Sequence, residues 1–378
     1  MRGEESDSRK KILFIIPSLV AGGAERSLLN LLLTLNQKKY KISIILLEDL
    51  PKVNPLEGLG NHGIVCLKKK NRWDLGRLVF CCGDNIRRIN PDVIVCVMTY
   101  STIITFFSLF FFSLNKKVIS WEHSVPVHDL RTERFSGLKA LLIKLFYRRA
   151  EKIITVSKEA AKEYIEYFYL KPENVMTIYN PIPLEVIKKK SLEAVDHPFI
   201  NGEDYLIITA GRLEHVKRYD RLLRIFALLR GQSIKAKLVI AGKGTLERDL
   251  RKLSKELGIQ DYVSFIGFRD DIFSWIKKAD LFVLTSDYEG FPMVLLESMA
   301  CGTPVITSYF AGVTELVENG KNGVIVNSND EKDFAQAIIK LLKDEELCET
   351  IKEHGLSCVK KFGTEKLVSD FEFVFDRA

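Results

Sequence analysis

Short apolar runs alternate with longer helical stretches along almost the whole chain, and this alternation restricts the fold more than any other feature. The runs KILFII (11–16), KISIILL (41–47) and DVIVCVM (92–98) are typical, and AERSLLNLLLTL (24–35) has its leucines at helical spacing. Because the runs are apolar throughout, they indicate strands that are covered on both faces. The pattern therefore predicts an α/β fold built on parallel sheets.

The alternation lapses once, in a charged and aperiodic stretch between Pro183 and Pro198, and restarts with YLIITAGRL (205–213). A chain of 378 residues is long enough for two domains with separate cores. We therefore predict two Rossmann-like, doubly wound domains facing across a cleft at the carboxyl ends of their strands. The expected boundaries are an N-terminal domain at 1–185, a linker at 186–200, a C-terminal domain at 201–355 and a C-terminal helix at 356–378 that packs back on the N-terminal domain.

The composition excludes several classes of protein. Apolar residues make up 47% and charged residues 28% of the chain, which is the balance of a folded globular protein. The net charge of +7 does not by itself imply nucleic acid, although it permits attraction to phosphates or to an anionic membrane. Seven cysteines without a CxxC spacing indicate reduced thiols in a cytosolic compartment rather than a metal site or a disulfide framework. We expect no signal peptide, because the polar N-terminus leads into an apolar run of only six residues.

Two segments leave the relation to membranes open. TIITFFSLFFFSL (102–114) spans about 20 Å as a helix, which is too short for a hydrocarbon core of roughly 30 Å. It predicts either a buried helix of the α/β layer or an interfacial patch. The segment 131–149 combines leucine, isoleucine and phenylalanine with lysine and arginine, so it fits either an anionic membrane surface or an ordinary surface helix.

Two loops that follow predicted strands carry residues suited to anion binding. In PSLVAGGAER (17–26), Gly22 and Gly23 precede a helix whose amides can receive an anion or a sugar hydroxyl, although such a pair is also ordinary turn chemistry. In AGRLEHVKRYD (210–220), Arg212 and Lys217 can point at one spot beyond the sheet edge. Two cations in a cleft suit a diphosphate leaving group. The alternative is a solvated loop, since Arg218 and Arg221 are also basic.

Two further loops lie in the second half of the chain. AGKG (241–244) lets the backbone at Gly242 approach a flat ligand or a phosphate, but it lacks the third glycine and the acidic residue of a dinucleotide fingerprint, so an NAD enzyme is disfavoured. In YEGFPMVLLESMACGTPV (288–305), Pro292 is expected as the first residue of a helix whose early amides form an anion site. Glu297 can accept hydrogen bonds from a vicinal diol such as a ribose. The alternative, a solvated helix edge, fits its mostly apolar neighbours less well.

Together these motifs resemble the retaining family-4 glycosyltransferases of the GT-B fold. The resemblance covers almost the whole chain, from GGAER through WEHS (121–124), TVSKEA, YNPIP, GRLEHVK, AGKG and FIGFRDDI to EGFPMVLLESMACGTPV. The separation of Glu289 and Glu297 matches the E-x7-E motif of that family. The order and spacing of the motifs make the resemblance specific.

The resemblance implies roles for individual residues. Arg212 and Lys217 would hold the diphosphate, Glu289 the donor sugar, and His123 would touch the sugar near the reacting carbon; these four are the expected catalytic residues. Glu297 would bind the ribose, Gly22 and Gly23 would line the junction of donor and acceptor, and the segment from Gly267 would flank the base. The residues expected in donor binding are Glu297, Gly290, Phe291, Pro292, Met293, Val294, Gly22, Gly23, Gly242, Gly267, Phe268 and Arg269.

The implied activity is that of a retaining hexosyltransferase that needs no metal and no cofactor, so that Asp270 and Asp271 are not expected to hold a metal. The donor would be a nucleotide diphosphate sugar, with UDP favoured, and the acceptor a glycan hydroxyl, with a polyprenyl-diphosphate-linked glycan as the hypothesis. The expected setting is cytoplasmic and, by the same hypothesis, peripheral on the inner membrane face, with no nucleic acid partner. The alternatives are a non-catalytic scaffold that binds sugar nucleotides and a GT-B nucleotide-sugar epimerase.

Overall fold

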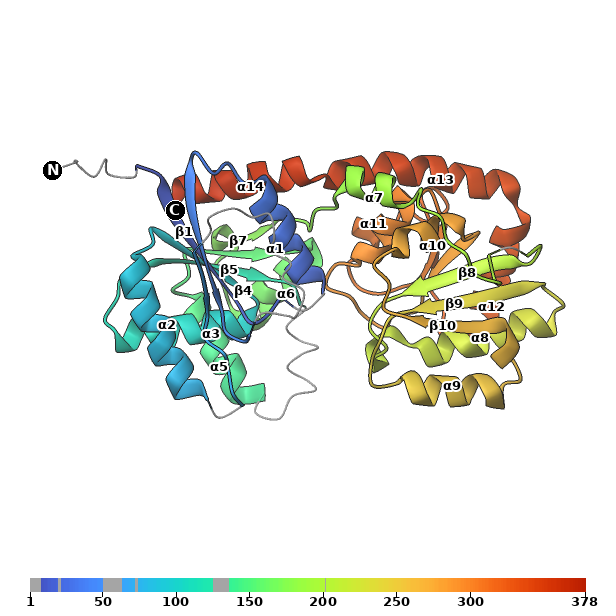
Figure 1. The fold of residues 1–378 in the computed structure, drawn as a ribbon, viewed down its shortest axis with the longest axis horizontal. Helices are drawn as coiled ribbons and strands as arrows, with labels where there is room; N and C mark the ends of the chain where they lie inside the picture. Colours follow the sequence, from blue (N-terminus) through green and yellow to red (C-terminus); the bar gives the residue numbers. More distant parts are fainter. Residues whose placement is uncertain (1–7, 20–21, 50–62, 72–73, 125–135, 201) are drawn as a thin grey trace. The chain divides into compact units, whose positions relative to one another are not determined.

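The computed structural model describes residues 8–19, 22–49, 63–71, 74–124, 136–200 and 202–378. The chain divides into two compact units, one formed by Met1–Pro181 with Thr364–Ala378 and the other by Ile182–Gly363. Each unit is built on a parallel sheet with helices on its faces (Figure 1). The predicted α/β class with two doubly wound domains is therefore confirmed.

The first unit contains a seven-stranded sheet in the order β3-β2-β1-β4-β5-β6-β7, and the paired strands are parallel. Its strands are β1 (Lys10–Ile16), β2 (Tyr40–Leu46), β3 (Gly63–Cys66), β4 (Val93–Val97), β5 (Lys117–Glu122), β6 (Lys152–Thr155) and β7 (Val175–Thr177). Its helices are α1 (Gly23–Thr34), α2 (Leu75–Ile89), α3 (Thr99–Phe111), α5 (Ser136–Tyr147), α6 (Lys158–Phe168), the 3-10 turn η1 (Pro172–Asn174) and α14 (Thr364–Arg377).

Helices cover both faces of this first sheet. Alternate strand residues such as Phe14 pack with α1 and α14 in one core, whereas their neighbours such as Ile15 pack with α2, α3, α5 and α6 in another. Phe14 and Ile15 are both fully buried, although they point to opposite faces. Burial on both faces is the physical reason for the uninterrupted apolar runs.

The second unit contains a six-stranded parallel sheet in the order β10-β9-β8-β11-β12-β13. Its strands are β8 (Tyr205–Ala210), β9 (Ala236–Ala241), β10 (Val263–Gly267), β11 (Leu281–Leu284), β12 (Val305–Ser308) and β13 (Val324–Val326). Its helices are α7 (Leu184–Lys190), α8 (Tyr219–Gly231), α9 (Glu247–Glu256), α10 (Ile272–Lys278), α11 (Met293–Ala300), α12 (Glu331–Lys343) and α13 (Glu345–Val359), with the 3-10 turns η2 (His215–Lys217), η3 (Gln260–Tyr262), η4 (Val313–Glu315) and η5 (Lys360–Phe362).

The boundaries between the units differ from the expected ones. Much of the segment 186–200, expected as a linker, belongs structurally to the second unit, where α7 packs against α10 and α11. Ile187 is fully buried there, and the Ser274 hydroxyl donates to the carbonyl of Lys190 at 2.7 Å. The chain returns to the first unit after Gly363, because α13 ends in the turn η5 and α14 starts afresh at Thr364.

The phenylalanine-rich segment forms a helix of the α/β layer. On α3, Ile104, Phe106 and Leu109 are buried against the sheet, whereas Phe110 and Phe111 are 72% and 68% exposed. One face of the helix is therefore buried in the α/β layer, and its C-terminal end exposes an apolar patch, so each of the two interpretations describes part of the segment. In the parts of the chain that the structure describes, no helix has both the length and the apolar character that crossing a bilayer requires.

Candidate active site

The most informative site lies at the carboxyl edge of the second sheet. Strands β8 and β11 are hydrogen-bonded neighbours, and from this pair the chain builds the sheet outward in opposite directions. The loops that leave the two strands, 211–218 and 285–292, therefore start side by side at a topological switch point. Ligands of open parallel sheets bind in the crevice at such a point.

An ion pair joins these two loops. The ammonium group of Lys217 donates to the Oε1 atom of Glu289 at 2.6 Å, and the hydroxyl of Ser286 donates to the same oxygen at 2.6 Å. The side chains of Lys217 and Glu289 are only 16% and 12% exposed, so water screens their charges weakly. The predicted catalytic residues Lys217 and Glu289 are therefore held together as one group.

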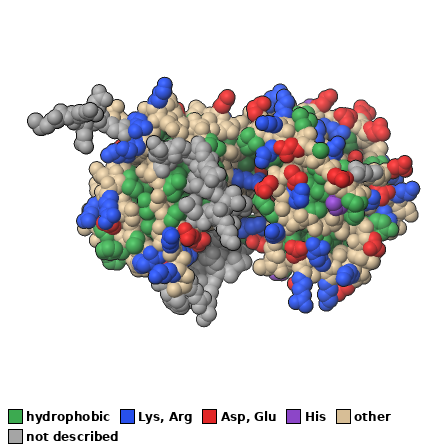
Figure 2. Space-filling model, viewed as in Figure 1, with side chains coloured by type: hydrophobic (Ala, Val, Ile, Leu, Met, Phe, Trp, Pro, Cys, Tyr) green, Lys and Arg blue, Asp and Glu red, His purple; other side chains and the backbone are tan. Residues whose placement is uncertain are grey.

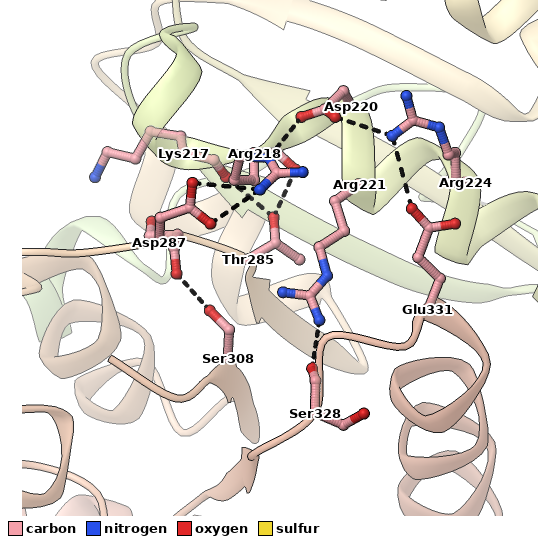
Figure 3. A network of polar contacts seen from close by, with 11 residues as sticks. Lys217, Arg218, Asp220, Arg221, Arg224, Thr285, Asp287, Ser308, Ser328 and Glu331 are labelled. Carbon is pink, nitrogen blue, oxygen red and sulfur yellow. Dashed lines mark hydrogen bonds and ion pairs between the residues drawn. The ribbon is translucent and has the colours of Figure 1, made fainter. Parts of the chain in front are cut away.

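A network of polar contacts behind Lys217 fixes the backbone of its loop (Figure 3). The Thr285 hydroxyl donates to the carbonyls of Lys217 and Arg218, both at 3.1 Å. The guanidinium of Arg218 donates to both carboxylate oxygens of Asp287, at 3.1 and 3.3 Å, and the amide of Asp287 donates to the carbonyl of Val216. In Figure 3 the side chain of Lys217 points away from this network, which leaves its ammonium group for the Glu289 side.

The same network continues into helices α8 and α12. Asp220 accepts hydrogen bonds from Arg218 and Arg224, and Arg224 also lies 3.6 Å from a carboxylate oxygen of Glu331. Arg221 is only 6% exposed and donates to the carbonyl of Ser328. Arg218 and Arg221 therefore make structural contacts. They do not support the alternative interpretation, in which this segment is a solvated loop.

Arg212 is placed differently from Lys217. Its side chain is 72% exposed and its guanidinium lies 3.3 Å from a carboxylate oxygen of Glu214. Such an exposed pair contributes little to stability, so Arg212 can exchange Glu214 for another anion at small cost. Of the two cations expected at one spot, the structure holds Lys217 in place and leaves Arg212 at the surface.

Glycines bring the neighbouring loops unusually close to one another. Gly242 has φ +139°, and a Cβ atom at this position would lie 1.9 Å from the carbonyl oxygen of Gly211. The Gly242 amide also donates to the carbonyl of Gly267 at 2.7 Å. The ends of β8, β9 and β10 are thus packed backbone to backbone, which only glycine allows at position 242.

The start of α11 differs in detail from the prediction. Pro292 is the N-cap residue, and Met293 rather than Pro292 is the first helical residue. The amide of Met293 donates to the carbonyl of Phe291 at 2.9 Å, and that of Leu295 to Pro292 at 3.0 Å. Fewer amides are therefore open to an anion than we expected, because a γ-turn bond and a 3-10-type bond already use two of them.

The side chains of this segment are largely buried. Phe291 and Met293 are each 9% exposed, and the ring of Phe291 lies 5.8 Å from that of Phe362, so both residues can serve a ligand only through their backbone. Gly290 and Val294 are partly exposed. Glu297, within α11, is 6% exposed, which rules out the alternative of a solvated helix edge.

The loop after β10 carries the residues expected beside the base. Phe268 is 46% exposed, which makes its ring available for stacking. The guanidinium of Arg269 donates to both carboxylate oxygens of Asp271, at 2.7 and 2.6 Å, and lies 5.8 Å from the ring centre of Trp275. The hydrogen bond from Arg269 holds the pKa of Asp271 below its usual range.

The first unit contains the remaining predicted residues. Gly22 is the N-cap residue of α1 and Gly23 its first helical residue. His123 directly follows β5, and neither of its buried ring nitrogens has a hydrogen-bond partner within the described ranges. Burial lowers the pKa of His123 to about 3, so its ring is neutral at physiological pH.

The sequence analysis missed Glu122, the residue next to His123. Its carboxylate is fully buried and accepts hydrogen bonds from the hydroxyls of Ser120 at 2.6 Å, Thr99 at 2.8 Å and Tyr164 at 3.1 Å. Two further hydroxyl donors to the same carboxylate are Thr102 and Tyr147. The sequence did contain a signal for this residue, since Glu122 is a charged residue at the end of the apolar run KVISWE. A carboxylate buried at the end of a strand requires hydrogen-bond donors around it.

The two parallel-sheet units have the architecture of the GT-B fold. HepE from Anabaena, solved in complex with UDP and glucose, matches with a TM-score of 0.82 and 20% identity over 98% of this chain and all of that one. Sucrose-phosphate synthase from Thermosynechococcus elongatus matches with a TM-score of 0.81 and 18% identity over 98% of this chain and 99% of that one. At this identity the two structures show the fold alone.

The sequence comparisons give the family. Residues 21–186 match the model of Glycosyltransferase Family 4, and residues 193–357 match that of Glycosyl transferases group 1. The chain therefore belongs to the group 1, or family-4, glycosyltransferases.

Two relatives with named activities cover different shares of the chain. The chain is 28% identical to N-acetylgalactosamine-N,N'-diacetylbacillosaminyl-diphospho-undecaprenol 4-alpha-N-acetylgalactosaminyltransferase of Campylobacter jejuni, over 96% of this chain and 98% of that protein. It is 31% identical to N-acetyl-alpha-D-glucosaminyl L-malate synthase of Bacillus anthracis, over 62% of this chain and 61% of that protein. The two named acceptors are chemically unlike each other, one a lipid-linked sugar and the other malate. Family membership therefore establishes glycosyl transfer and leaves the substrates to be determined.

Proposed function

We propose that this chain is a retaining glycosyltransferase that moves a hexose or an N-acetylhexosamine from a UDP-sugar to a hydroxyl of a polyprenyl-diphosphate-linked glycan. The observation that carries the proposal is the largely buried ion pair of Lys217 and Glu289 at the switch point of the second sheet. The Campylobacter jejuni relative, which is named for a diphospho-undecaprenol acceptor and aligns over 96% of this chain, supports the choice of acceptor. The UDP bound to HepE supports the choice of base.

The proposed reaction breaks the bond between the anomeric carbon and the diphosphate oxygen and forms a bond from that carbon to the acceptor hydroxyl on the same face. The acceptor proton passes to the departing phosphate oxygen. Lys217 stabilises the charge that grows on the diphosphate, and Arg212 joins it by leaving Glu214. Glu289, which Lys217 and Ser286 orient, accepts hydrogen bonds from hydroxyls of the donor sugar.

The remaining residues are proposed to bind the rest of the donor. Glu297 accepts from the ribose, while Gly242 and the segment 267–269 contact the base and the phosphates mainly through backbone. The segment 290–294 contacts the sugar and the diphosphate, again through backbone where the side chains are buried. From the first unit, His123 contacts the sugar near the reacting carbon, and Gly22 and Gly23 line the junction with the acceptor.

A donor panel tests this function. Purified protein is incubated with UDP- and GDP-sugars, and binding is measured by calorimetry while free sugar and free nucleotide are measured by chromatography. We expect one UDP-sugar to bind and to be hydrolysed slowly in the absence of acceptor. Binding without any release of sugar would indicate the non-catalytic scaffold, and release of an epimerised nucleotide sugar would indicate the epimerase.

The transfer is expected to resist chelators. Lys217, Arg212 and the backbone amides supply the charge that a divalent cation supplies in other transferases, and Asp271 is already engaged by Arg269. Turnover in the presence of EDTA should therefore stay within about twofold of the untreated rate. An activity that EDTA abolishes and magnesium or manganese restores would contradict this prediction.

We further propose that the first unit docks on an anionic membrane surface. On α5, Leu138, Leu141 and Leu145 are 60%, 62% and 47% exposed and lie at helical spacing, and the exposed Arg148 and Arg149 follow the same helix. An apolar stripe beside basic residues is the arrangement of a helix that lies in the headgroup region. This placement suits an acceptor carried by a membrane lipid.

The neighbouring surface extends the apolar area. A groove of about 470 Å³ is lined by Leu75, Gly76, Val79, Phe80, Phe107, Phe111 and Phe112 of α2 and α3. The ring of Phe107 also contacts that of Phe146 on α5, with ring centres 5.2 Å apart, so the groove and the helix are adjacent. The part of the first unit visible in Figure 2 shows hydrophobic and basic side chains together, whereas on the second unit acidic and basic side chains are mixed.

Liposome sedimentation tests the docking surface. We expect the protein to sediment with vesicles that contain anionic phospholipid at low salt, and to remain in solution with neutral vesicles. Replacing Leu138, Leu141 and Leu145 by serine should weaken vesicle binding about 100-fold, because about half of each leucine is exposed and roughly 1 kcal/mol of apolar burial per leucine is lost. Leu192→Ser, at a 77% exposed position of the second unit, is the matched control. The proposal would be contradicted if the triple variant bound vesicles as well as the wild type does. It would also be contradicted if these leucines formed the interface of a dimer in solution.

A further inference from the structure

The ring of Trp121 connects His123 to Phe371 on the C-terminal helix. The ring of His123 lies 4.7 Å from that of Trp121, measured between centres, and Trp121 lies 4.6 Å from Phe371 of α14 with an interplanar angle of 62°. Both contacts lie within the first unit. Trp121 and Phe371 are fully buried, so neither can touch a ligand directly. The contact between Trp121 and His123 is a route by which they can affect a reaction.

The environment of His123 suggests that these contacts hold it ready for a ligand. Within the described residues, both ring nitrogens of His123 and the indole nitrogen of Trp121 are buried without a hydrogen-bond partner. A buried polar atom without a partner costs free energy unless a ligand or water completes it. Since no described residue forms a hydrogen bond with the imidazole, packing against Trp121 is the contact within the described residues that can set its orientation.

Helix α14 is itself firmly attached to the first unit, which lets it serve as a support. The ring of Phe375 lies 6.3 Å from that of Phe14 and 5.6 Å from that of Tyr40. The Tyr40 hydroxyl donates to Asp376 at 3.0 Å, and the ammonium group of Lys39 donates to the same carboxylate at 2.8 Å. These contacts fix the helix one turn beyond Phe371, so the position of Phe371 is well determined.

We propose that Trp121 and Phe371 are positioning residues that set the orientation of His123 for glycosyl transfer. The inference rests on the proposed function for the role of His123. The inference gives a role to α14, which follows the second unit in sequence but belongs to the first unit in space. Through Phe371 and Trp121 this helix would help to fix the position of His123. Loss of the Phe371 ring should therefore affect turnover more than it affects binding of the nucleotide.

The test compares four variants of the full chain. Phe371→Leu and Trp121→Phe remove the ring contacts while keeping apolar volume. Phe373→Leu is a control on the same helix, since its ring is 51% exposed and contacts Arg377. Phe168→Leu is a control for buried volume, since it lies in the core on the other face of the sheet.

Two measurements separate positioning from general destabilisation. The imidazole of His123, assigned by comparison with His123→Gln, is followed by NMR from about pH 5 to 8, where a solvated imidazole titrates. We expect no titration in wild type and in the controls, and a titration with a changed shift in Phe371→Leu and Trp121→Phe. The same two variants should lose about 10- to 100-fold in kcat with the donor KM nearly unchanged.

The outcomes are distinct. A His123 resonance in Phe371→Leu that matches the wild type overturns the inference, and so does an equal loss of kcat in Phe168→Leu. A changed resonance with unchanged kcat also overturns it, because the orientation of His123 would then not matter. If wild type itself shows no transfer with any donor, the proposed function fails, whereas the NMR comparison still decides whether Trp121 and Phe371 hold His123.

Discussion

Lys217→Met should lower kcat about 10²- to 10³-fold, which is the effect expected when one preorganised positive charge is removed from a developing negative charge. The side chain of Lys217 is only 16% exposed and its ammonium group lies 2.6 Å from a carboxylate oxygen of Glu289, so little water is available to replace the charge. Methionine keeps most of the apolar length of the side chain and removes the charge together with the N–H donors. Initial rates with the UDP-sugar identified by the donor panel give kcat and KM for both proteins.

A matched lysine separates this effect from a loss of general positive charge. Lys235 is exposed immediately before β9, at the opposite end of the second sheet, so Lys235→Met should leave kcat within about twofold. Glu289→Gln should also reduce kcat, because it weakens both the orientation of Lys217 and the contact with the sugar. The double variant should lose less than the sum of the two single losses, since the pair acts as one group. A Lys217→Met enzyme with the kcat of wild type would remove Lys217 from the reaction.

The loops proposed to carry the chemistry could be located from the sequence because their places depend on local rules. Strands that are apolar throughout predicted parallel sheets, and in such sheets the loops after the strands carry the ligand sites. That reasoning selected Lys217, and the family resemblance added Glu289, without any knowledge of the contact between the two side chains. It also selected Gly242, whose neighbour in space, Gly211, lies 31 positions earlier in the chain.

Other features could not be predicted because they depend on side chains that are distant in sequence. Arg221 appeared to be one basic residue among many, and only its packing beside Phe334 and its bond to Ser328 show that it is buried. Pro292 was expected as the first helical residue, but the carbonyl of Phe291 captures the next amide and moves the start of the helix to Met293. The expected linker differs from the structure for a similar reason. Its residue Ile187 is buried because α7 packs against α10 and α11, which lie far away in the sequence.

Glu122 is the residue whose importance the structure alone reveals, and its replacement should have the largest effect on stability. Its carboxylate is the shared acceptor for five hydroxyls from β5, α3, α5 and α6, and Glu122→Ala leaves those hydroxyls to find new partners in a closed core. Each buried hydroxyl that stays unpaired costs about 1–3 kcal/mol. We therefore expect a loss of about 3 kcal/mol or more, seen as a thermal transition of the first unit that falls by roughly 6–12 °C.

Hydrogen exchange on the full chain assigns the loss to one unit, which a single melting temperature of a two-unit protein cannot do. Protection in Glu122→Ala should fall in β5, α3 and α6 and stay unchanged in the second unit, because the hydroxyl donors all belong to the first. Glu122→Gln should fall between wild type and Glu122→Ala, since its amide oxygen still accepts while its amide nitrogen meets only hydroxyls. Glu151→Ala, an exposed glutamate of the same unit, should change neither measurement. If Glu122→Ala behaves like Glu151→Ala, the hydroxyl cluster contributes nothing to stability and this prediction is wrong.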